Sequence, residues 1–557
     1  MTAAIWYRPD AYSISGPKLM GRHAAGASFL RGWFRHAGLS RWHCLAPDEA
    51  QARTFAATAL SLVAGAQVEW IPPDCPAGLA NPGCLFLPSP GLGTFAWQRR
   101  SVGQRLFSLC GLTHTIASER AMDELAGLLS APVQPWDALI CTSDPVKTAV
   151  EAFLGPHAEH LAARFGGRVP ALPRFPVIPL GIDTDAFAPD PGRRAAARTR
   201  LGIAPDAVAV LFVGRLSFHA KAHPFPMYAA LEEAAQRTRI PVHLIQVGWF
   251  ANDFIEGAFK EGAARWCPSV RASFLDGRDA AVRADAWAGT DLFVSLSDNI
   301  QESFGLAPVE AMAAGLPCVV SDWDGYKDTV RDGVDGFRVP TVAPPRGLGT
   351  DIALRFAAEV DSYDRYIGRA GAFTAVDVAA TAEALTRLIV DPDLRARMGE
   401  AGRGRALEVF DWRVIIPRYL SLFAELAEIR RTAPETAPPA DPAHGNLSRP
   451  DPFGMFAAYP SHVVGLDTMI VARPSGTPEG LARVLADPLA TLALDLLPAR
   501  EELEATLAVL ATLGRTTVAD LLGRVPEDRR LLLARALVFL AKFDLVALAP
   551  FAAVETA

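Results

Sequence analysis

Short apolar runs alternate with longer helical patterns up to about residue 425, and this alternation restricts the fold more than any other feature. The candidate strands are "AIWY" (4–7), "ALICTS" (138–143), "VAVLFVG" (208–214), "VHLIQVG" (242–248), "DLFVSL" (291–296) and "PCVVSD" (317–322). Because strands separated by helices are joined by crossover connections, the pattern predicts α/β units with parallel sheets. Several of these runs end at small residues, where an open α/β sheet usually places its ligand loops.

The 557 residues are too many for a single core, and composition changes indicate where the chain divides. We expect two Rossmann-like domains facing a cleft, each an α/β unit, followed by a mainly helical module. The predicted boundaries are 1–180, a linker at 181–206, 207–431, a Pro-rich linker at 432–452, and 453–557. The last segment is rich in Leu and Ala, and its pattern leaves open a winged-helix-like module or a plain helical appendage.

Charge, cysteine content and hydropathy exclude several classes of protein. A formal charge of −7, from 61 acidic and 54 basic residues, argues against a nucleic-acid partner. The seven cysteines are scattered singly, so we expect reduced, buried thiols rather than disulfides or a zinc site. The first residues lack the pattern of a signal peptide, and no apolar run is long enough to span a bilayer. These features predict a cytoplasmic protein, and they leave contact with a membrane surface open.

The stretch "ESFGLAPVEAMAAGLPC" (302–318) combines two carboxylates with a helix start. Glu302 is expected in a loop, and Glu310 in the first turn of a helix that begins near Ala307. Between them the backbone N–H groups of residues 304–306 and the helix dipole favour an anion such as phosphate. Carboxylates beside that anion suit sugar hydroxyls, so the stretch predicts a ligand that is part phosphate and part polyol. On spacing alone, an ordinary helix with acidic residues on a solvated face is the favoured explanation of the two glutamates.

With its surroundings, this stretch resembles the E-x7-E signature of the retaining nucleotide-sugar glycosyltransferases of the GT-B fold, the family-4 type of glycosyl transferases group 1. Three other segments agree with the resemblance. "VIPLGIDTDAFAPD" (177–190) is similar to the family's interdomain stretch, "VLFVGRLSFHAKAHP" (210–224) to its strand with Arg and Lys, and "FDWRVIIPRYLSLF" (410–423) to its closing helix. The resemblance covers about residues 5–428 and is strongest from 175 to 340.

The resemblance implies a set of site residues in the second domain. Arg215 and Lys221 would clamp the diphosphate and neutralise charge on the leaving nucleotide, with Gly214 beside them. Glu302 would hold a hydroxyl of the donor sugar, and Glu310 the ribose hydroxyls. Backbone groups for sugar and phosphate would come from Ser303, Phe304, Gly305 and Leu306.

The first domain supplies fewer matches to the family. The segment "SGPKLMGRHAAG" (15–26) resembles the family's glycine loop, with Gly21 and Arg22 as the best-fitting residues. "FSLCGLTHTIAS" (107–118) resembles the strand and loop that place a histidine beside the sugar, which makes His114 a candidate catalytic residue. The usual pair of glycines is missing from the first of these segments.

Some positions depart from the family's pattern. Ala222 replaces the glycine that usually follows the lysine. In "SDWDGYKDTVRDG" (321–333), Gly325 corresponds to the second of two glycines and Asp328 to a glutamate, whereas Trp323 and Tyr326 are bulky. The "DTD" at 183–185 matches the Asp-x-Asp of metal-dependent transferases, but the family's interdomain stretch usually has this sequence as well. We therefore expect no metal, and no cofactor other than the donor substrate.

The resulting prediction is transfer of a sugar from a nucleoside diphosphate sugar to an acceptor hydroxyl, with retention of anomeric configuration and without a metal. The acceptor, which is a glycan, a lipid or a small molecule, would meet the first domain. Residues 453–557 would bind a partner or another subunit. The competing hypotheses are a sugar-nucleotide epimerase or phosphorylase that shares the fold, and a degenerate transferase that acts as a scaffold through its C-terminal domain.

Overall fold

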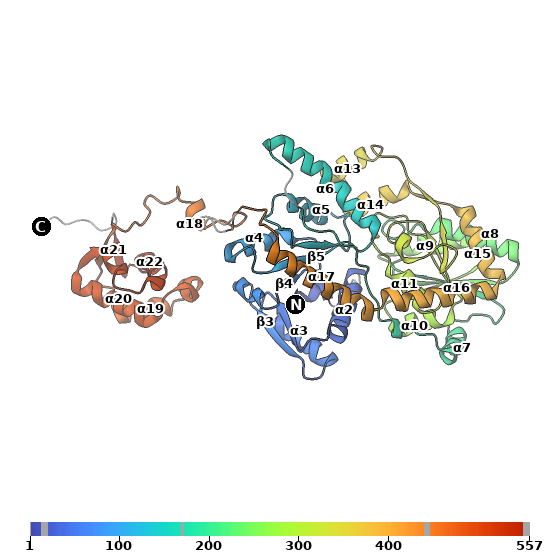
Figure 1. Cartoon of the computed structure of the whole chain (residues 1–557), viewed down its shortest axis with the longest axis horizontal. Coiled ribbons are helices and arrows are strands. Elements are labelled where there is room, and N and C mark those ends of the chain that lie inside the picture. Colours follow the sequence, from blue (N-terminus) through green and yellow to red (C-terminus); the bar gives the residue numbers. More distant parts are fainter. Residues whose placement is uncertain (1, 13–20, 169–171, 439–445, 550–557) are drawn as a thin grey trace. The chain divides into compact units, whose positions relative to one another are not determined.

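The computed structural model describes residues 2–12, 21–168, 172–438 and 446–549 (Figure 1). The chain forms two compact units, Met1–Arg449 and Pro450–Ala557. The first unit contains two lobes, each built on a parallel six-stranded sheet with helices on its faces. The predicted α/β class with two Rossmann-like domains and a helical C-terminal region is therefore confirmed.

The first lobe holds the sheet β3-β2-β1-β4-β5-β6, in which every neighbouring pair is parallel. Its strands are β1 (Ala4–Trp6), β2 (Arg41–Leu45), β3 (Gln67–Ile71), β4 (Cys84–Phe86), β5 (Ser108–Leu112) and β6 (Ala138–Ile140). Its helices are α1 (Pro9–Tyr12), α2 (Gly21–His36), α3 (Glu49–Leu62), α4 (Leu92–Val102), α5 (Glu119–Ala126) and α6 (Asp144–Phe165).

The second lobe repeats this plan in the sheet β12-β11-β10-β7-β8-β9. Its strands are β7 (Val208–Val213), β8 (Val242–Gly248), β9 (Arg271–Asp276), β10 (Leu292–Ser295), β11 (Cys318–Ser321) and β12 (Gly336–Val339). The helices around them are α7 (Pro191–Arg200), α8 (Pro224–Thr238), α9 (Asp253–Trp266), α10 (Ala280–Gly289), α11 (Leu306–Ala313), α12 (Tyr326–Thr329), α15 (Val378–Val390) and α16 (Pro392–Arg405). Between β12 and α15 the chain makes an excursion of β13 (Thr341–Val342), α13 (Thr350–Ala357), α14 (Tyr363–Ala372) and β14 (Ala375–Val376).

Numbered within each lobe, both sheets have the strand order 3-2-1-4-5-6 of a doubly wound fold. All strands are parallel, but successive strands are added toward one edge of the sheet up to the third strand and toward the other edge from the fourth, so this switch lies between β1 and β4 in one lobe and between β7 and β10 in the other. Ligands of open α/β sheets bind at the carboxyl ends of the strands at this switch point. The fold therefore predicts a ligand site at the loops that follow β7 and β10.

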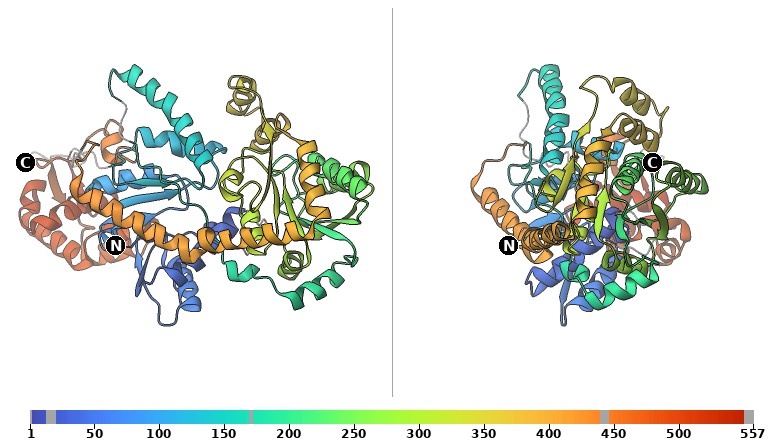
Figure 2. Two further views of the ribbon diagram at one scale, coloured as in Figure 1. Left: turned by 45° about the vertical axis from the view of Figure 1, so that its right-hand side comes forward. Right: turned by 90° about the vertical axis from the view of Figure 1, so that its right-hand side faces the viewer.

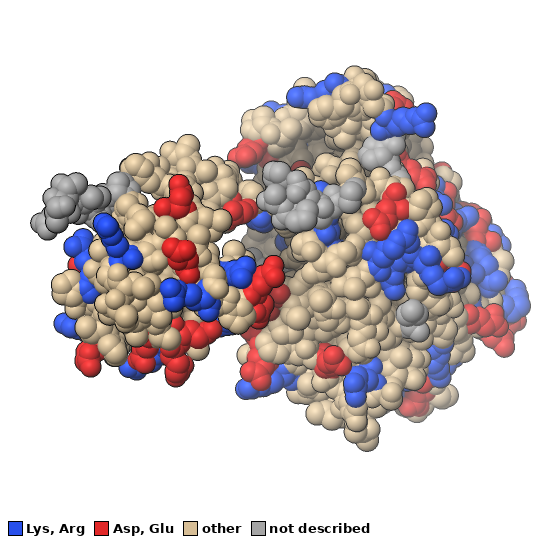
Figure 3. All heavy atoms as spheres, turned by 60° about the vertical axis from the view of Figure 1, so that its left-hand side comes forward, with Lys and Arg blue, Asp and Glu red and all other residues tan. Residues whose placement is uncertain are grey.

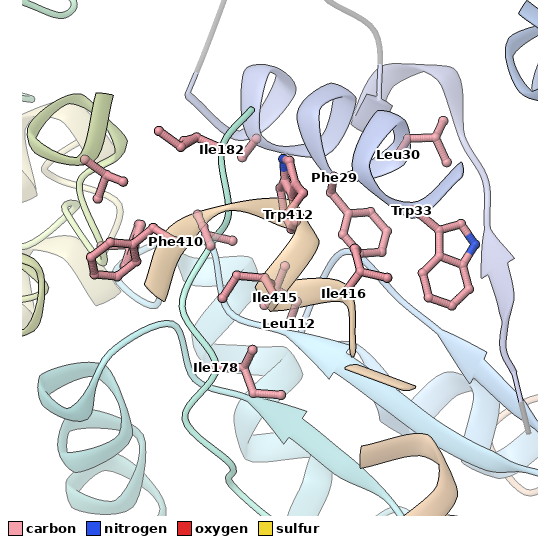
Figure 4. Close-up of a cluster of buried hydrophobic side chains, with 14 of the residues drawn as sticks. Phe29, Leu30, Trp33, Leu112, Ile178, Ile182, Phe410, Trp412, Ile415 and Ile416 are labelled. Carbon is pink, nitrogen blue, oxygen red and sulfur yellow. The ribbon is translucent and has the colours of Figure 1, made fainter. Parts of the chain in front are cut away.

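The long helix α17 (Trp412–Thr432) follows the second lobe in sequence but packs into the core of the first (Figure 2). Trp412 is 2% exposed, and its indole nitrogen donates to the hydroxyl of Ser28 on α2 at 2.8 Å. The close-up in Figure 4 shows Trp412 beside Phe29, with Ile415 and Ile416 on the next turn of the helix. The chain passes between the lobes twice, once near Ile182 and once at the start of α17. Two backbone hydrogen bonds join these segments: Ile182 N–H donates to the Phe410 carbonyl, and Trp412 N–H donates to the Ile182 carbonyl.

The C-terminal unit combines helices with a small antiparallel sheet, so the plain helical appendage, one of the two alternatives that the sequence left open, is wrong. The sheet β16-β15-β17 is formed by β15 (Met469–Ala472), β16 (Arg515–Thr517) and β17 (Val546–Leu548). Its helices include α18 (Pro452–Met455), α19 (Pro478–Leu485), α20 (Arg500–Leu513), α21 (Val518–Leu522) and α22 (Glu527–Lys542). The unit has a core of its own, in which Ile470, Leu481 and Leu537 are fully buried.

Surface charge and hydropathy are unremarkable. On the face drawn in Figure 3, acidic and basic side chains are interspersed, as the nearly balanced composition suggests. None of the helices within the described ranges is long and apolar enough to cross a membrane. The seven cysteines are all free, and six are buried as expected, whereas Cys75 is exposed.

Candidate active site

The loops after β7 and β10 meet at the switch point of the second lobe. Arg215, two residues after β7, donates from Nη2 to the side-chain oxygen of Gln301 at 2.9 Å and to the carbonyl of Ala220 at 3.3 Å. Burial lowers the pKa of Arg215, although a guanidinium remains charged at any physiological pH. The arginine named from the sequence is thus fixed within the β7 loop and tied to the β10 loop.

Lys221 and Glu302 form an ion pair across the same two loops, with Nζ 2.9 Å from Oε2. Burial of Glu302 opposes ionisation, but the Lys221 ammonium and the amides of Ser303 and Gly305 hold the pKa of this carboxyl below its usual value. Glu302 is therefore an anion that is paired with Lys221 and lies near the backbone amides that the sequence predicted as ligand-binding groups.

Glu310 lies in the second turn of α11, not in the first turn as the sequence predicted, and its chemistry is different. Its carboxyl has no hydrogen bond or ion pair among the described residues, and burial raises its pKa to about 7, with Arg283 only partly opposing this shift. The structure thus separates the two glutamates of the E-x7-E stretch. One is paired with Lys221 and has a lowered pKa, whereas the other has a raised pKa and has no hydrogen-bond partner among the described residues.

The turn between the two glutamates is held by close packing. Gly305 has φ +83°, and a Cβ placed there would lie 2.0 Å from Cε1 of Tyr326. The Tyr326 ring is buried and its hydroxyl hydrogen-bonds with Ser295 at 2.8 Å. Phe304 points into the core against Phe410, with ring centroids 6.0 Å apart, so only its backbone can face a ligand. Leu306, also named from the sequence, is the first residue of α11.

The first lobe contacts this turn at Ser303. The Ser303 hydroxyl donates to the carbonyl of His114, and its own carbonyl accepts from Ser143 Oγ at 2.9 Å and from Thr142 Oγ1 at 3.3 Å. Nearby, the carboxylate of Asp328 accepts the backbone N–H of Asp144, which begins α6, at 2.6 Å. His114 is therefore brought to the turn by its backbone, in a closed arrangement of the two lobes.

Two further carboxyl groups line these loops and were not assigned by the sequence analysis. Asp324 occupies the first position of the expected glycine pair and has φ +42°, a conformation that explains why glycine is usual there. Burial, reinforced by the neighbouring charge of Glu302, raises the pKa of Asp324 to about 8, and the nearby side chain of Ser143 opposes this shift only in part. Asp298 is 3% exposed, and burial raises its pKa to about 7.

The remaining candidates are more distant or only partly described. Gly21 and Arg22 begin α2, but residues 13–20 of the expected glycine loop and the side chain of Arg22 lie outside the described residues. In the Asp-x-Asp segment, Asp183 pairs with Arg35 at 2.9 Å and Asp185 with Arg413 at 3.1 Å. Across the described ranges, His, Cys, Asp and Glu side chains form no group of three or more suited to a metal ion.

A cavity of about 450 Å³ opens between the lobes beside this site. One wall comes from the start of α5, and the other from the α13–α14 excursion. The lining residues are Ser118, Glu119, Arg120, Phe356, Glu359, Asp361, Ser362 and Tyr363. Of these, Tyr363 also accepts a hydrogen bond from Gln301, and Gln301 accepts one from Arg215. The side chains of Tyr363 and Gln301 therefore connect the cavity to Arg215.

Residues 207–353 match the family described as glycosyl transferases group 1. Curated relatives include a D-inositol 3-phosphate glycosyltransferase of Geodermatophilus obscurus, 36% identical over 29% of this chain and 36% of that protein. A phosphatidyl-myo-inositol mannosyltransferase of Mycobacterium tuberculosis is 30% identical over 45% of this chain and 54% of that protein. The chain spans between about a third and about half of the length of these relatives.

Solved structures with a related arrangement include Alr3699/HepE of Anabaena in complex with UDP and glucose, at 17% identity and a TM-score of 0.47, covering 76% of this chain and all of that one. Sucrose-phosphate synthase of Thermosynechococcus elongatus has 19% identity and a TM-score of 0.43, covering 76% of this chain and 96% of that one.

Proposed function

We propose that this chain is a glycosyltransferase that moves a sugar from a nucleoside diphosphate sugar to an acceptor hydroxyl, with retention of anomeric configuration and without a metal. The observation that carries the proposal is the meeting of Arg215, Lys221 and Glu302 at the switch point between β7 and β10. The match of residues 207–353 to glycosyl transferases group 1 supports the same activity.

The charges of the site suit a diphosphate. Arg215 and Lys221 supply two cations, and an incoming diphosphate would replace Glu302 as the partner of Lys221. Glu302 would then be available to accept a hydrogen bond from a hydroxyl of the donor sugar, and Glu310 from the ribose. Because the pKa of Glu310 lies near 7 and that of Asp324 near 8, these carboxyls carry much less negative charge at neutral pH than ordinary acids would.

In the proposed reaction, the bond between the anomeric carbon and the β-phosphate oxygen breaks as the acceptor oxygen bonds to that carbon. The proton of the acceptor hydroxyl leaves with the diphosphate. Arg215 and Lys221 stabilise the charge that develops on the leaving group, and their effect is largest where water is excluded. The contacts of Ser143 and Thr142 with Ser303 close the lobes over this point.

The acceptor is expected in the cleft between the lobes. Two of the curated relatives are named for inositol-containing acceptors, so inositol 3-phosphate and phosphatidylinositol belong in the first acceptor panel together with simple glycans. We propose that residues 450–557 bind a partner or a second subunit, because they form a unit with its own core.

The test is a panel of UDP-, GDP- and ADP-sugars scored for release of the nucleoside diphosphate with and without acceptor. Arg215→Ala and Glu302→Ala should each lower release at least about 100-fold. Arg200→Ala removes a surface arginine that pairs with Asp285, and it should leave the rate unchanged. The proposal fails if no donor binds, or if both site variants release nucleotide as fast as the unmodified protein.

The product then distinguishes the remaining hypotheses. Proton NMR of the glycoside formed from an α-linked donor should show an α-linkage, and a β-linkage would contradict retention. Formation of an epimeric sugar nucleotide in the absence of acceptor would instead indicate an epimerase. Donor binding with neither transfer nor hydrolysis would indicate a scaffold.

A further inference from the structure

The α13–α14 excursion lies outside the strand–helix alternation of the second lobe. It leaves the sheet after β12 and returns through a two-stranded antiparallel ribbon, in which Thr341 pairs with Val376. The two helices stand away from the sheet, as Figure 2 shows. Ile367 anchors α14: it is fully buried in a small cluster with Ala220 of the second lobe and Ala117 of the first. The excursion therefore bridges the β7 loop and the opposite lobe.

The first residue of α14, Tyr363, is linked to Arg215 through one side chain. The amide nitrogen of Gln301 donates to the Tyr363 hydroxyl at 2.9 Å, and the amide oxygen of Gln301 accepts from Arg215 at 2.9 Å. The Tyr363 side chain also packs against the cluster that contains Ala117 of the first lobe, and it lies near Thr115, which follows His114. A single phenol thus contacts both lobes and, through Gln301, the arginine.

Gln301 itself is held in place. Its backbone N–H donates to the side chain of Asn299 at 2.9 Å, and that side chain donates to the carbonyl of His219 at 2.7 Å. The indole of Trp323 donates to the Asn299 carbonyl at 3.1 Å. With its backbone fixed and both ends of its amide bonded, Gln301 has one orientation, in which its oxygen faces Arg215. Fixing that orientation removes rotational freedom that the long arginine side chain would otherwise lose on binding.

We infer that Tyr363 is a positioning residue: packed against the first lobe and hydrogen-bonded to Gln301, it forms with Gln301 a relay that holds Arg215 in its diphosphate-binding orientation when the lobes are in contact. This inference rests on the proposed function, because it presumes that Arg215 binds a diphosphate. Tyr363 does not need to touch the donor. The relay therefore links closure of the lobes to the orientation of Arg215, the cation that would stabilise the leaving diphosphate.

Tyr363→Phe is the direct test, since it removes one hydroxyl and keeps the ring. Binding of UDP, GDP and ADP to the full chain is measured by titration calorimetry, and the nucleoside of the best ligand is measured in parallel. We expect Tyr363→Phe to raise the Kd of the diphosphate about tenfold and to leave nucleoside binding unchanged. Gln301→Leu, which breaks the relay at its centre, should give the same pattern.

Tyr366→Phe is the matched control. Tyr366 lies one turn later on α14, its ring stacks on Phe356 at 4.3 Å, and its hydroxyl has no hydrogen bond among the described residues. Its loss should change neither Kd. In an Arg215→Ala background, Tyr363→Phe should have no further effect on the Kd of the diphosphate, because the relay then has nothing to hold.

The outcomes separate the inference from the proposed function. If the unmodified chain binds no nucleoside diphosphate, the proposed function and the inference are both overturned. If it binds one but Tyr363→Phe behaves like Tyr366→Phe, only the inference is overturned. Equal weakening of nucleoside and diphosphate binding, or additive effects with Arg215→Ala, would overturn it as well, since either result indicates a general structural role.

Discussion

Replacing Gly305 with alanine tests whether the turn between the two glutamates is set by packing. The new Cβ would lie 2.0 Å from Cε1 and 2.6 Å from Cδ1 of Tyr326. Real Cβ contacts are never so short, so the turn or the ring must move. The ring is buried, and moving it would break the bond between its hydroxyl and Ser295. The perturbation therefore acts on the backbone that joins Glu302 to α11.

The expected cost has two parts. A residue with a Cβ loses about 1–2 kcal/mol in the left-handed conformation that Gly305 adopts at φ +83°. Overpacking a buried site adds about 1–3 kcal/mol. Gly38→Ala isolates the first part, because Gly38 also has a positive φ, +63°, but a Cβ there would meet nothing within 4 Å. We therefore expect Gly305→Ala to lower the free energy of unfolding by about 2–5 kcal/mol, clearly more than Gly38→Ala.

Urea unfolding of the full chain, followed by tryptophan fluorescence, measures both costs. The same two substitutions are then compared in a Tyr326→Ala background, where the obstructing ring is absent. There, Gly305→Ala should cost no more than Gly38→Ala. Equal costs in the unmodified background would refute the reasoning, because the Tyr326 ring would then play no part in shaping the turn.

Three other predictions follow from buried or bridging carboxyl groups. Asp137 forms a fully buried bidentate pair with Arg99, so Asp137→Asn should lower the free energy of unfolding by about 3–5 kcal/mol, measured in urea. Burial raises the pKa of Glu310 from its ordinary 4.5 to about 7, so ionising this carboxyl costs stability as the pH rises from 4.5 through 7. Glu310→Gln should therefore raise the free energy of unfolding by on the order of 2 kcal/mol at pH 8 and by nothing at pH 4. Asp328→Ala removes the acceptor for the first N–H of α6, at Asp144, and should speed hydrogen exchange there about fivefold.

The first of these predictions has a matched control, and the other two each have an outcome that would contradict them. Glu425→Gln breaks an ion pair with Arg174 in which both side chains are half exposed, and it should cost less than about 1 kcal/mol. A stability difference for Glu310→Gln that is the same at pH 4 and pH 8 would contradict the assignment of the shifted pKa. Unchanged exchange at Asp144 in Asp328→Ala would show that the contact between the lobes is not maintained in solution.

Much of the second lobe could be predicted from the sequence, because the charged residues of the site lie in the loops that directly follow recognisable strands. "VAVLFVG" and "DLFVSL" were identified as strands, and β7 and β10 lie within them. Parallel neighbours must bring the loops that follow to one edge, so Arg215 and Glu302, 87 positions apart in sequence, could be placed in one site. That Lys221 pairs with Glu302 was not predicted, since the choice of partner depends on side-chain geometry.

Other parts of the site leave no local signal. Tyr363 begins a helix in an ordinary amphipathic segment, and only the tertiary fold brings it to Gln301 and Thr115. Asp324 could have been suspected, because it stands where the family's pattern has glycine, but its raised pKa depends on burial beside Glu302. The strands of the C-terminal unit, three or four residues long, are too short for a period-two pattern to distinguish them from loops.

The path of α17 has a consequence for biosynthesis. Trp412, Tyr419 and Phe423 of α17 cover helix α2 and strands β4 and β5 of the first lobe. The ribosome adds these three residues only after the whole second lobe. A nascent chain that ends near residue 400 therefore carries a first lobe with its apolar face uncovered, although all six of its strands have been made. Such a chain should attract chaperones and proteases until α17 emerges, and the first lobe, unlike most N-terminal domains, should reach its final stability only after the second lobe has been synthesised.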